Sequence, residues 1–199
     1  MLVNKQDRDI LRELGKQVAE IAALPVQQET IALWVASNGL RPERPMVMID
    51  QVCWHEMEVD GELALQTEEA WCQGLETGLR RTLYAWRHMR ADMVVEPVID
   101  VPRVIRGAGL GVQPVEDRAV LDPANDVVGH YYIDQLQNEE DLEKIQMPGV
   151  SLDEEATALA EAKAHEVFDG ILEVRMQGAL PNFAPWDALV QWHGVENTL

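Results

Sequence analysis

The sequence predicts an α/β protein in which parallel strands are covered by outer helices. Three observations support this. Short apolar runs alternate along the chain with longer segments of helical spacing, which is typical of strand–helix–strand units. The runs are continuous rather than alternating, as expected for strands buried on both faces. Polar or charged residues end each run, and the carboxyl ends of parallel strands are where such folds place their chemistry.

The composition is that of one globular domain over residues 1–199, with 47% hydrophobic and 26% charged residues. Asp and Glu outnumber Lys and Arg 35 to 16, for a formal charge of -19. Such a surface repels phosphate backbones and anionic lipids, so we expect no nucleic-acid and no membrane partner. The two cysteines indicate no disulfide framework, and the N-terminus does not resemble a signal peptide. The expected location is cytoplasmic.

Helical patterns cover a large part of the chain. Residues 1–44 form a helical lead-in with two expected helices, followed by barrel-type strands and helices over residues 45–199. Thr67 is the expected cap of a strong third helix. The remaining expected helices are a short one at 138–144, a longer one at 153–168 and a last one from Trp186.

Three apolar runs are the expected principal strands, at residues 46–49, 92–95 and 171–176. A β-rich insertion is expected near residues 111–134, with short strands at 111–116, 119–121 and 131–133.

Three segments resemble the uroporphyrinogen decarboxylase-like superfamily in their order and spacing. The first is Arg-Pro-Met-Val-Met-Ile-Asp-Gln at 44–51, after the helical pair. The second is Asp-Met-Val-Val-Glu-Pro at 92–97, followed by Val-Pro at 101–102 and Gly-Leu-Gly-Val at 109–112. The third is the strand at 170–175 with Gly-Ala-Leu-Pro-Asn-Phe at 178–183. The resemblance implies a partial TIM-type (β/α) barrel, corresponding to the N-terminal part of the family fold.

Family members are either decarboxylases of a tetrapyrrole or methyltransferases acting with corrinoid proteins and thiols, commonly with zinc. Decarboxylases resemble one another in an Arg-Gln-Ala-Gly-Arg motif after the first strand, whose arginines hold substrate carboxylates. Here the matching stretch is Asp50-Gln51-Val52-Cys53-Trp54, in which only Gln51 agrees. An aspartate in place of an arginine reverses the charge, so the resemblance favours the methyltransferase branch.

The methyltransferase zinc motif, His-x-Cys with a later Cys, has no match in this sequence. Cys53 and His55 lie two apart, but two ligands do not make a zinc site. We therefore predict no metal ligands and no cofactor within this chain. The resemblance implies that a corrinoid partner or zinc would belong to the complete enzyme.

The predicted catalytic residues are Asp50, His55 and Glu96. Asp50 ends the first strand, His55 is an imidazole that titrates near neutrality, and Glu96 follows the second strand as a general base or polar contact. The alternatives are an ion pair of Asp50 with an arginine such as Arg175, and a surface position for His55. The predicted substrate-binding residues are Gln51, Trp54, Arg175 and Gln177, with an ion pair as the alternative for Arg175.

Three hypotheses of function follow. The first is a corrinoid- or thiol-linked methyltransferase acting on a small methylated compound. The second is true uroporphyrinogen decarboxylation, which would need an arginine from elsewhere. The third is a truncated, non-catalytic barrel module, because a complete barrel has eight strands and typically about 250 residues. Exposed strand edges would then favour self-association or pairing with a complementary C-terminal half.

Overall fold

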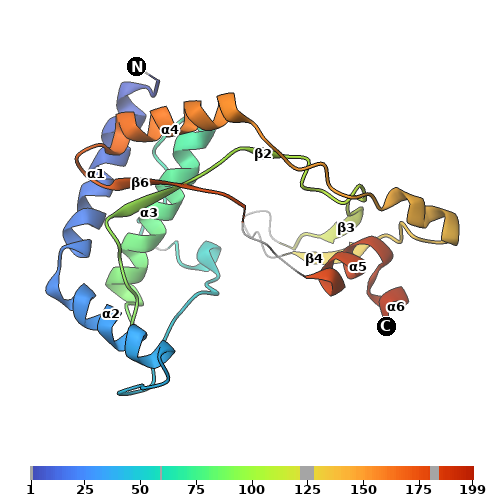
Figure 1. Cartoon of the computed structure of the whole chain (residues 1–199), viewed down its shortest axis with the longest axis horizontal. Coiled ribbons are helices and arrows are strands. Elements are labelled where there is room, and N and C mark those ends of the chain that lie inside the picture. The colour runs from blue at the N-terminus through green and yellow to red at the C-terminus, as the bar shows by residue number, and fades with distance from the viewer. Residues whose placement is uncertain (1, 59, 122–127, 180–183) are drawn as a thin grey trace. The chain divides into compact units, whose positions relative to one another are not determined.

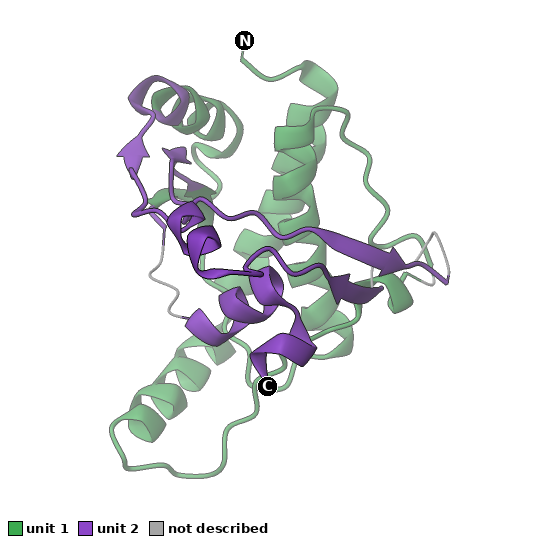
Figure 2. Ribbon diagram, turned by 90° about the vertical axis from the view of Figure 1, so that its right-hand side faces the viewer, with its two compact units in different colours: residues 1–101, 158–177 green, residues 102–157, 178–199 purple. Residues whose placement is uncertain are grey.

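The computed structural model describes residues 2–58, 60–121, 128–179 and 184–199. They divide into unit 1 (residues 1–101 and 158–177) and unit 2 (residues 102–157 and 178–199), shown in different colours in Figure 2. Helices and a few short strands make up both units, which confirms the mixed α/β class. The strands within the described ranges form three two-stranded sheets and no closed barrel.

The helices of unit 1 follow the sequence prediction closely. They are α1 (Lys5–Ala22), α2 (Pro25–Asn38), the one-turn 3₁₀ helix η1 (Trp54–Glu56), α3 (Ala70–His88) and α4 (Glu154–Phe168), whose first turn belongs to unit 2. Helices α1 and α3 lie side by side (Figure 1). Their apolar stripes meet in the core with the last turn of α4 and the residues that follow it. The buried residues include Leu11, Val18, Leu75, Leu79, Leu83, Val167, Phe168 and Leu172.

Two buried carboxylates fasten the segment that leads into α3. Glu76, fully buried, accepts hydrogen bonds from the Thr67 backbone N–H (2.8 Å), the Thr67 hydroxyl (2.8 Å) and the Gln66 backbone N–H (2.9 Å). Arg80 donates its Nε to the same carboxylate over 2.7 Å. From α1, the buried Asp7 carboxylate accepts the backbone N–H groups of Glu68 and Glu69, both at 3.0 Å. The predicted role of Thr67 as the helix cap is therefore wrong: its hydroxyl binds Glu76, and Glu69 is the N-cap.

The two predicted strands at 46–49 and 92–95 are not strands, and in each run a side chain binds one backbone N–H group. The Asp92 carboxylate accepts from Arg44 (2.5 Å) and from the Val47 N–H (2.8 Å), and the Asp92 N–H donates to the Val47 carbonyl. These contacts lower the pKa of Asp92 to about 2, with the Arg44 hydrogen bond as the main cause. The Val95 N–H donates to the buried Gln27 side chain over 2.9 Å.

One sheet of unit 1 is observed, formed by β1 (Val98–Pro102) and β6 (Glu173–Gln177). The Glu173 N–H donates to the Pro97 carbonyl, and Arg175 pairs with Asp100 further along. Residue numbers therefore rise in the same direction along both strands, which is the sense of a parallel pair. The predicted third strand at 171–176 is confirmed with a shift of two residues, and the second strand begins after Pro97 rather than before it.

Unit 2 contains the short elements of the predicted insertion and the end of the chain. Strand β2 (Ile105–Arg106) pairs with β5 (Ser151–Leu152), and β3 (Glu116–Ala119) forms an antiparallel ladder with β4 (Gly129–Tyr132). The helices are η2 (Glu139–Lys144), α5 (Pro185–His193) and α6 (Val195–Thr198). The expected strand at 111–116 is wrong, as this stretch is irregular up to Glu116, and the one at 119–121 lies instead at β3. Leu180 to Phe183, part of the third family-like segment, lie outside the described residues.

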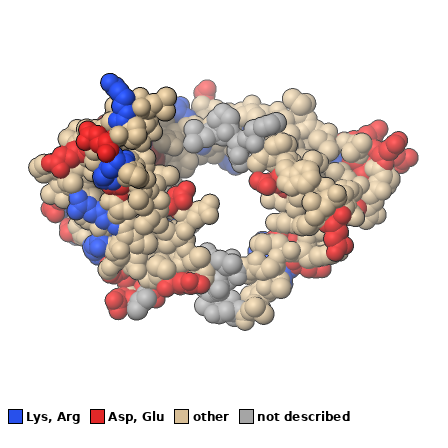
Figure 3. Space-filling model, turned by 90° about the horizontal axis from the view of Figure 1, so that it is seen from below, with Lys and Arg blue, Asp and Glu red and all other residues tan. Residues whose placement is uncertain are grey.

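None of the helices within the described ranges is long and apolar enough to cross a membrane. Acidic side chains are spread over the face drawn in Figure 3 and do not gather in one patch.

We predict that Glu76→Gln lowers the free energy of unfolding by about 2–3 kcal/mol, because it removes a buried charge that accepts four hydrogen bonds and pairs with Arg80. Urea denaturation followed by circular dichroism measures this. Glu161→Gln, an exposed change on α4, is the control and should be neutral. Equal stability of the two variants would contradict the role of Glu76.

The stabilisation by the buried carboxylates of Asp7 and Glu76 depends on pH. Burial raises the pKa of Asp7 and Glu76, but their hydrogen bonds outweigh burial, so both pKa values are lowered in the folded chain. Their stabilisation is therefore complete above the ordinary glutamate pKa of 4.5 and is lost as the pH falls below it. Glu76→Gln should flatten this acid limb of the stability curve.

Candidate functional site

A cavity of about 330 Å³ lies in unit 1 between α3 and the β1–β6 sheet. Its apolar wall comes from core residues such as Val18, Leu75 and Leu79. Its polar wall comes from Glu96, Asp100 and Arg175, at the start of β1 and on β6. An apolar wall facing a few convergent polar groups is the usual composition of a small-molecule site.

The charged residues of this cavity form a cluster centred on Arg175. Its guanidinium binds the Asp100 carboxylate in a two-bond fork, with Nε–Oδ1 at 2.6 Å and Nη2–Oδ2 at 2.9 Å. The Glu96 Oε2 lies 3.8 Å from Arg175 Nη2. The Arg175 hydrogen bond is the main cause of a lowered Asp100 pKa, with a smaller contribution from the Gln177 side chain. The same pairing raises the pKa of Arg175. Asp100 and Arg175 are therefore charged at neutral pH, and the cluster contains two carboxyl groups and one guanidinium.

Two glycines on α3 widen the cavity. Gly74 and Gly78 are one helical turn apart and line it together with Thr82. A Cβ added to either glycine would meet no atom within 4 Å. The space beside them is therefore open to a ligand rather than filled by a packed side chain.

The structure brings some of the predicted site residues together and separates others. Glu96 and Arg175 share the cavity, and Gln177, two residues after Arg175 on β6, contributes to the lowered pKa of Asp100. The predicted ion pair of Arg175 is formed, but with Asp100 rather than Asp50. Asp50 and Gln51 are exposed in an irregular segment and do not line the cavity.

Trp54 and His55 lie in η1, away from the described lining of this cavity. The Trp54 ring meets Tyr84 edge-on with centroids 6.0 Å apart, and the Arg81 guanidinium lies 5.0 Å above it. His55 Nε2 lies 3.6 Å from the Glu56 carboxylate. Trp54 therefore packs against α3.

Sequence reasoning missed Asp100, Gly74 and Gly78. Asp100 carried one signal, since it is the single charged residue of the 98–102 segment, with buried Ile99 and Val101 on either side. Its partner is on β6, 75 positions further along the chain, and only the strand pairing reveals it.

No protein-family model, no curated protein and no solved structure matches this chain.

The described residues do not fit a zinc centre. They contain no group of three or more His, Cys, Asp or Glu side chains arranged to hold a metal ion. Cys53 is exposed near His55, whereas Cys72 is buried beside Asp7, and burial raises the pKa of its thiol to about 12. Cys72 is thus an unreactive thiol of the core.

We predict that Gly78→Ala stabilises the chain and narrows the cavity. Alanine favours a helix over glycine by about 0.5–1 kcal/mol, and the new methyl group meets no atom here. Urea denaturation should show this gain. Loss of stability would mean that the space beside α3 is already filled.

Proposed function

We propose that this chain is a uroporphyrinogen decarboxylase-like protein of the methyltransferase branch, which acts on a small methylated substrate bound in the unit 1 cavity. The observation that supports it is the pairing of Arg175 with acidic neighbours. Its Nε and Nη2 both donate to the Asp100 carboxylate, and the Glu96 carboxylate lies 3.8 Å from Nη2. Among the described lining residues Arg175 is the one basic group, so the cavity offers no spare cation to a polycarboxylate.

The charge of the site therefore favours a neutral or cationic substrate over a tetrapyrrole with several carboxylates. A methylated amine or methylated sulfur compound has a suitable size and charge for this cavity. The family-like segments at 44–51 and 92–112 support the same branch, because the arginines of the decarboxylase motif are absent at 50–54.

In transfer from a methylammonium donor to a thiol, the carbon–nitrogen bond breaks and a carbon–sulfur bond forms. The amine leaves as a neutral molecule, and the thiol proton passes to a general base. Glu96 is the residue proposed to accept that proton. It is exposed just before β1, and its carboxylate lies 3.8 Å from Arg175. Asp100 holds Arg175 in place and is a positioning residue. A corrinoid protein is the alternative methyl acceptor.

We further propose that β1 and β6 are neighbouring strands of a (β/α) barrel, with α4 as the crossover helix. The rise of residue numbers in one direction along both strands supports this, as does the cavity at their polar face.

The proposal is tested by incubating the chain with methylated amines, ethers and thiols, with cob(I)alamin or a free thiol as acceptor. We expect methylated acceptor to form, and Glu96→Gln to reduce the rate to a thiol by about a hundredfold, the usual contribution of a general base. Glu161→Gln is the control and should leave the rate unchanged. Absence of transfer from every donor, or conversion of uroporphyrinogen to coproporphyrinogen, would contradict the proposal.

A second candidate function, as an assembly module, is favoured by one observation. Val47, Met48 and Ile49 are consecutive apolar residues that are half or more exposed, at 53%, 67% and 50%. Apolar runs of this kind commonly mark a surface that another chain covers.

We predict that the chain self-associates through residues 47–49. Size-exclusion chromatography with light scattering should show a mass that rises with concentration. Met48→Lys should shift the chain to monomer, whereas Leu142→Lys, a change at an exposed leucine of η2, should not. A monomer at every concentration would exclude the assembly role.

A further inference from the structure

Unit 2 has a cavity of its own, of about 260 Å³, beside the end of β4. It is lined by residues 130–132, Asp134 and residues 194–197. Its volume equals roughly nine water molecules of liquid, which is room for a small organic molecule. None of these residues takes part in the function proposed above.

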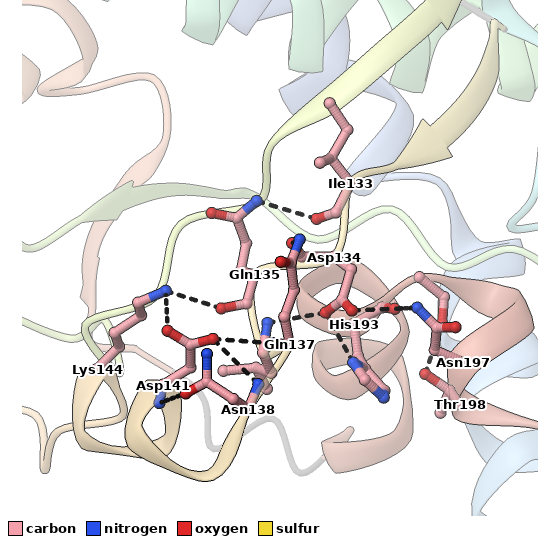
Figure 4. A network of polar contacts seen from close by, with 12 residues as sticks. Ile133, Asp134, Gln135, Gln137, Asn138, Asp141, Lys144, His193, Asn197 and Thr198 are labelled. Carbon is pink, nitrogen blue, oxygen red and sulfur yellow. Dashed lines mark hydrogen bonds and ion pairs between the residues drawn. The ribbon is translucent and has the colours of Figure 1, made fainter.

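A network of hydrogen bonds holds one wall of this cavity in place (Figure 4). Asp134 Oδ1 accepts from the Leu136 backbone N–H and from His193 Nδ1, both at 2.8 Å. Asp134 Oδ2 accepts from the Asn197 side-chain amide at 3.2 Å, and that amide also donates to the His193 carbonyl. The Asp134 carboxylate is thereby oriented before any ligand arrives.

The turn between α5 and α6 is shaped for a close approach to β4. Gly194 has a φ of 81°, a left-handed conformation that favours glycine, and a Cβ there would lie 3.2 Å from the Tyr132 carbonyl. The opposite wall is aromatic. The His130 and Tyr132 rings stack with centroids 5.8 Å apart and 7° between their planes. Glu116 Oε2 lies 2.8 Å from His130 Nδ1 and holds that ring from outside the cavity.

The described lining has two carboxyl groups and one imidazole, that of His130, which is bound by Glu116. Asp134 and Glu196 contribute carboxylates, and the lining includes neither lysine nor arginine. Burial raises the pKa of Asp134, but the His193 and Leu136 hydrogen bonds outweigh it, so the carboxyl is ionised at neutral pH. Carboxylates beside the faces of aromatic rings attract ammonium groups and repel anions.

We propose that this cavity is a binding site for a small organic cation, an amine with a compact apolar or planar body. The ammonium group lies between Asp134 and Glu196, and the body lies along the His130–Tyr132 stack.

The test uses three probes of similar size on the full chain: phenethylammonium, the neutral 2-phenylethanol and the anionic phenylacetate. Binding is measured by titration calorimetry and by shifts of tyrosine and histidine resonances. We expect saturable binding of phenethylammonium, about tenfold tighter than that of the alcohol, and no binding of phenylacetate. Equal affinity for all three probes would overturn the proposal.

Three variants locate the binding. Glu196→Gln, an exposed change in the lining, should weaken phenethylammonium binding about fivefold without altering the melting temperature. Glu140→Gln on η2, outside the lining, should leave the affinity unchanged. Glu96→Gln tests the unit 1 cavity. Loss of binding in Glu96→Gln with retention in Glu196→Gln would assign the cation to unit 1 and overturn the proposal. Failure of the methyl-transfer assay together with retained phenethylammonium binding that depends on Glu196 would contradict the proposed function alone.

Discussion

The buried carboxylate of Glu76 is the interaction on which unit 1 depends most. A charged group with no exposure is tolerated only when its lone pairs are occupied, and here two backbone N–H groups, a hydroxyl and a guanidinium occupy them. The carboxylate thus fixes the path of residues 66 and 67. Asp7 of α1 does the same for Glu68 and Glu69, so the entry to α3 is held from both sides.

The position of α3 in turn determines the shape and the lining of the unit 1 cavity. One side of α3 brings Leu75 and Leu79 into the core with α1, and Gly74 and Gly78 leave the adjoining side open. The β1–β6 sheet supplies the polar wall. There Arg175, the one basic residue of the described lining, is paired with Asp100 through two hydrogen bonds. Core packing and electrostatic preference are therefore set by neighbouring residues of the same elements.

The helices were largely predictable, because apolar spacing and local capping act within a few residues. Helix α4 begins one residue after its predicted start and ends at its predicted end, and α5 begins one residue before the predicted Trp186. The strands were harder, because an apolar run such as 46–49 becomes a strand only if another strand pairs with it. Asp92 binds the Val47 backbone instead, and Gln27 binds Val95, both across long separations in sequence. Glu96 and Arg175 were predicted from strand ends, but Asp100 required knowledge of the pairing.

The strong negative charge of the chain has a local meaning at both cavities. A net charge of -19 spread over the surface would by itself only favour solubility, because copies of the chain repel one another. In the unit 1 cavity, one carboxyl group, that of Glu96, lies beside the Arg175–Asp100 ion pair. In the unit 2 cavity, two carboxyl groups lie in the same lining as the stacked rings of His130 and Tyr132. Low-dielectric walls strengthen such fields at short range, whereas salt screens exposed charges beyond a Debye length of about 8–10 Å. The proposed preference for cationic over anionic ligands therefore depends on the few charges that line each cavity, and the remaining acidic surface would add steering but little specificity.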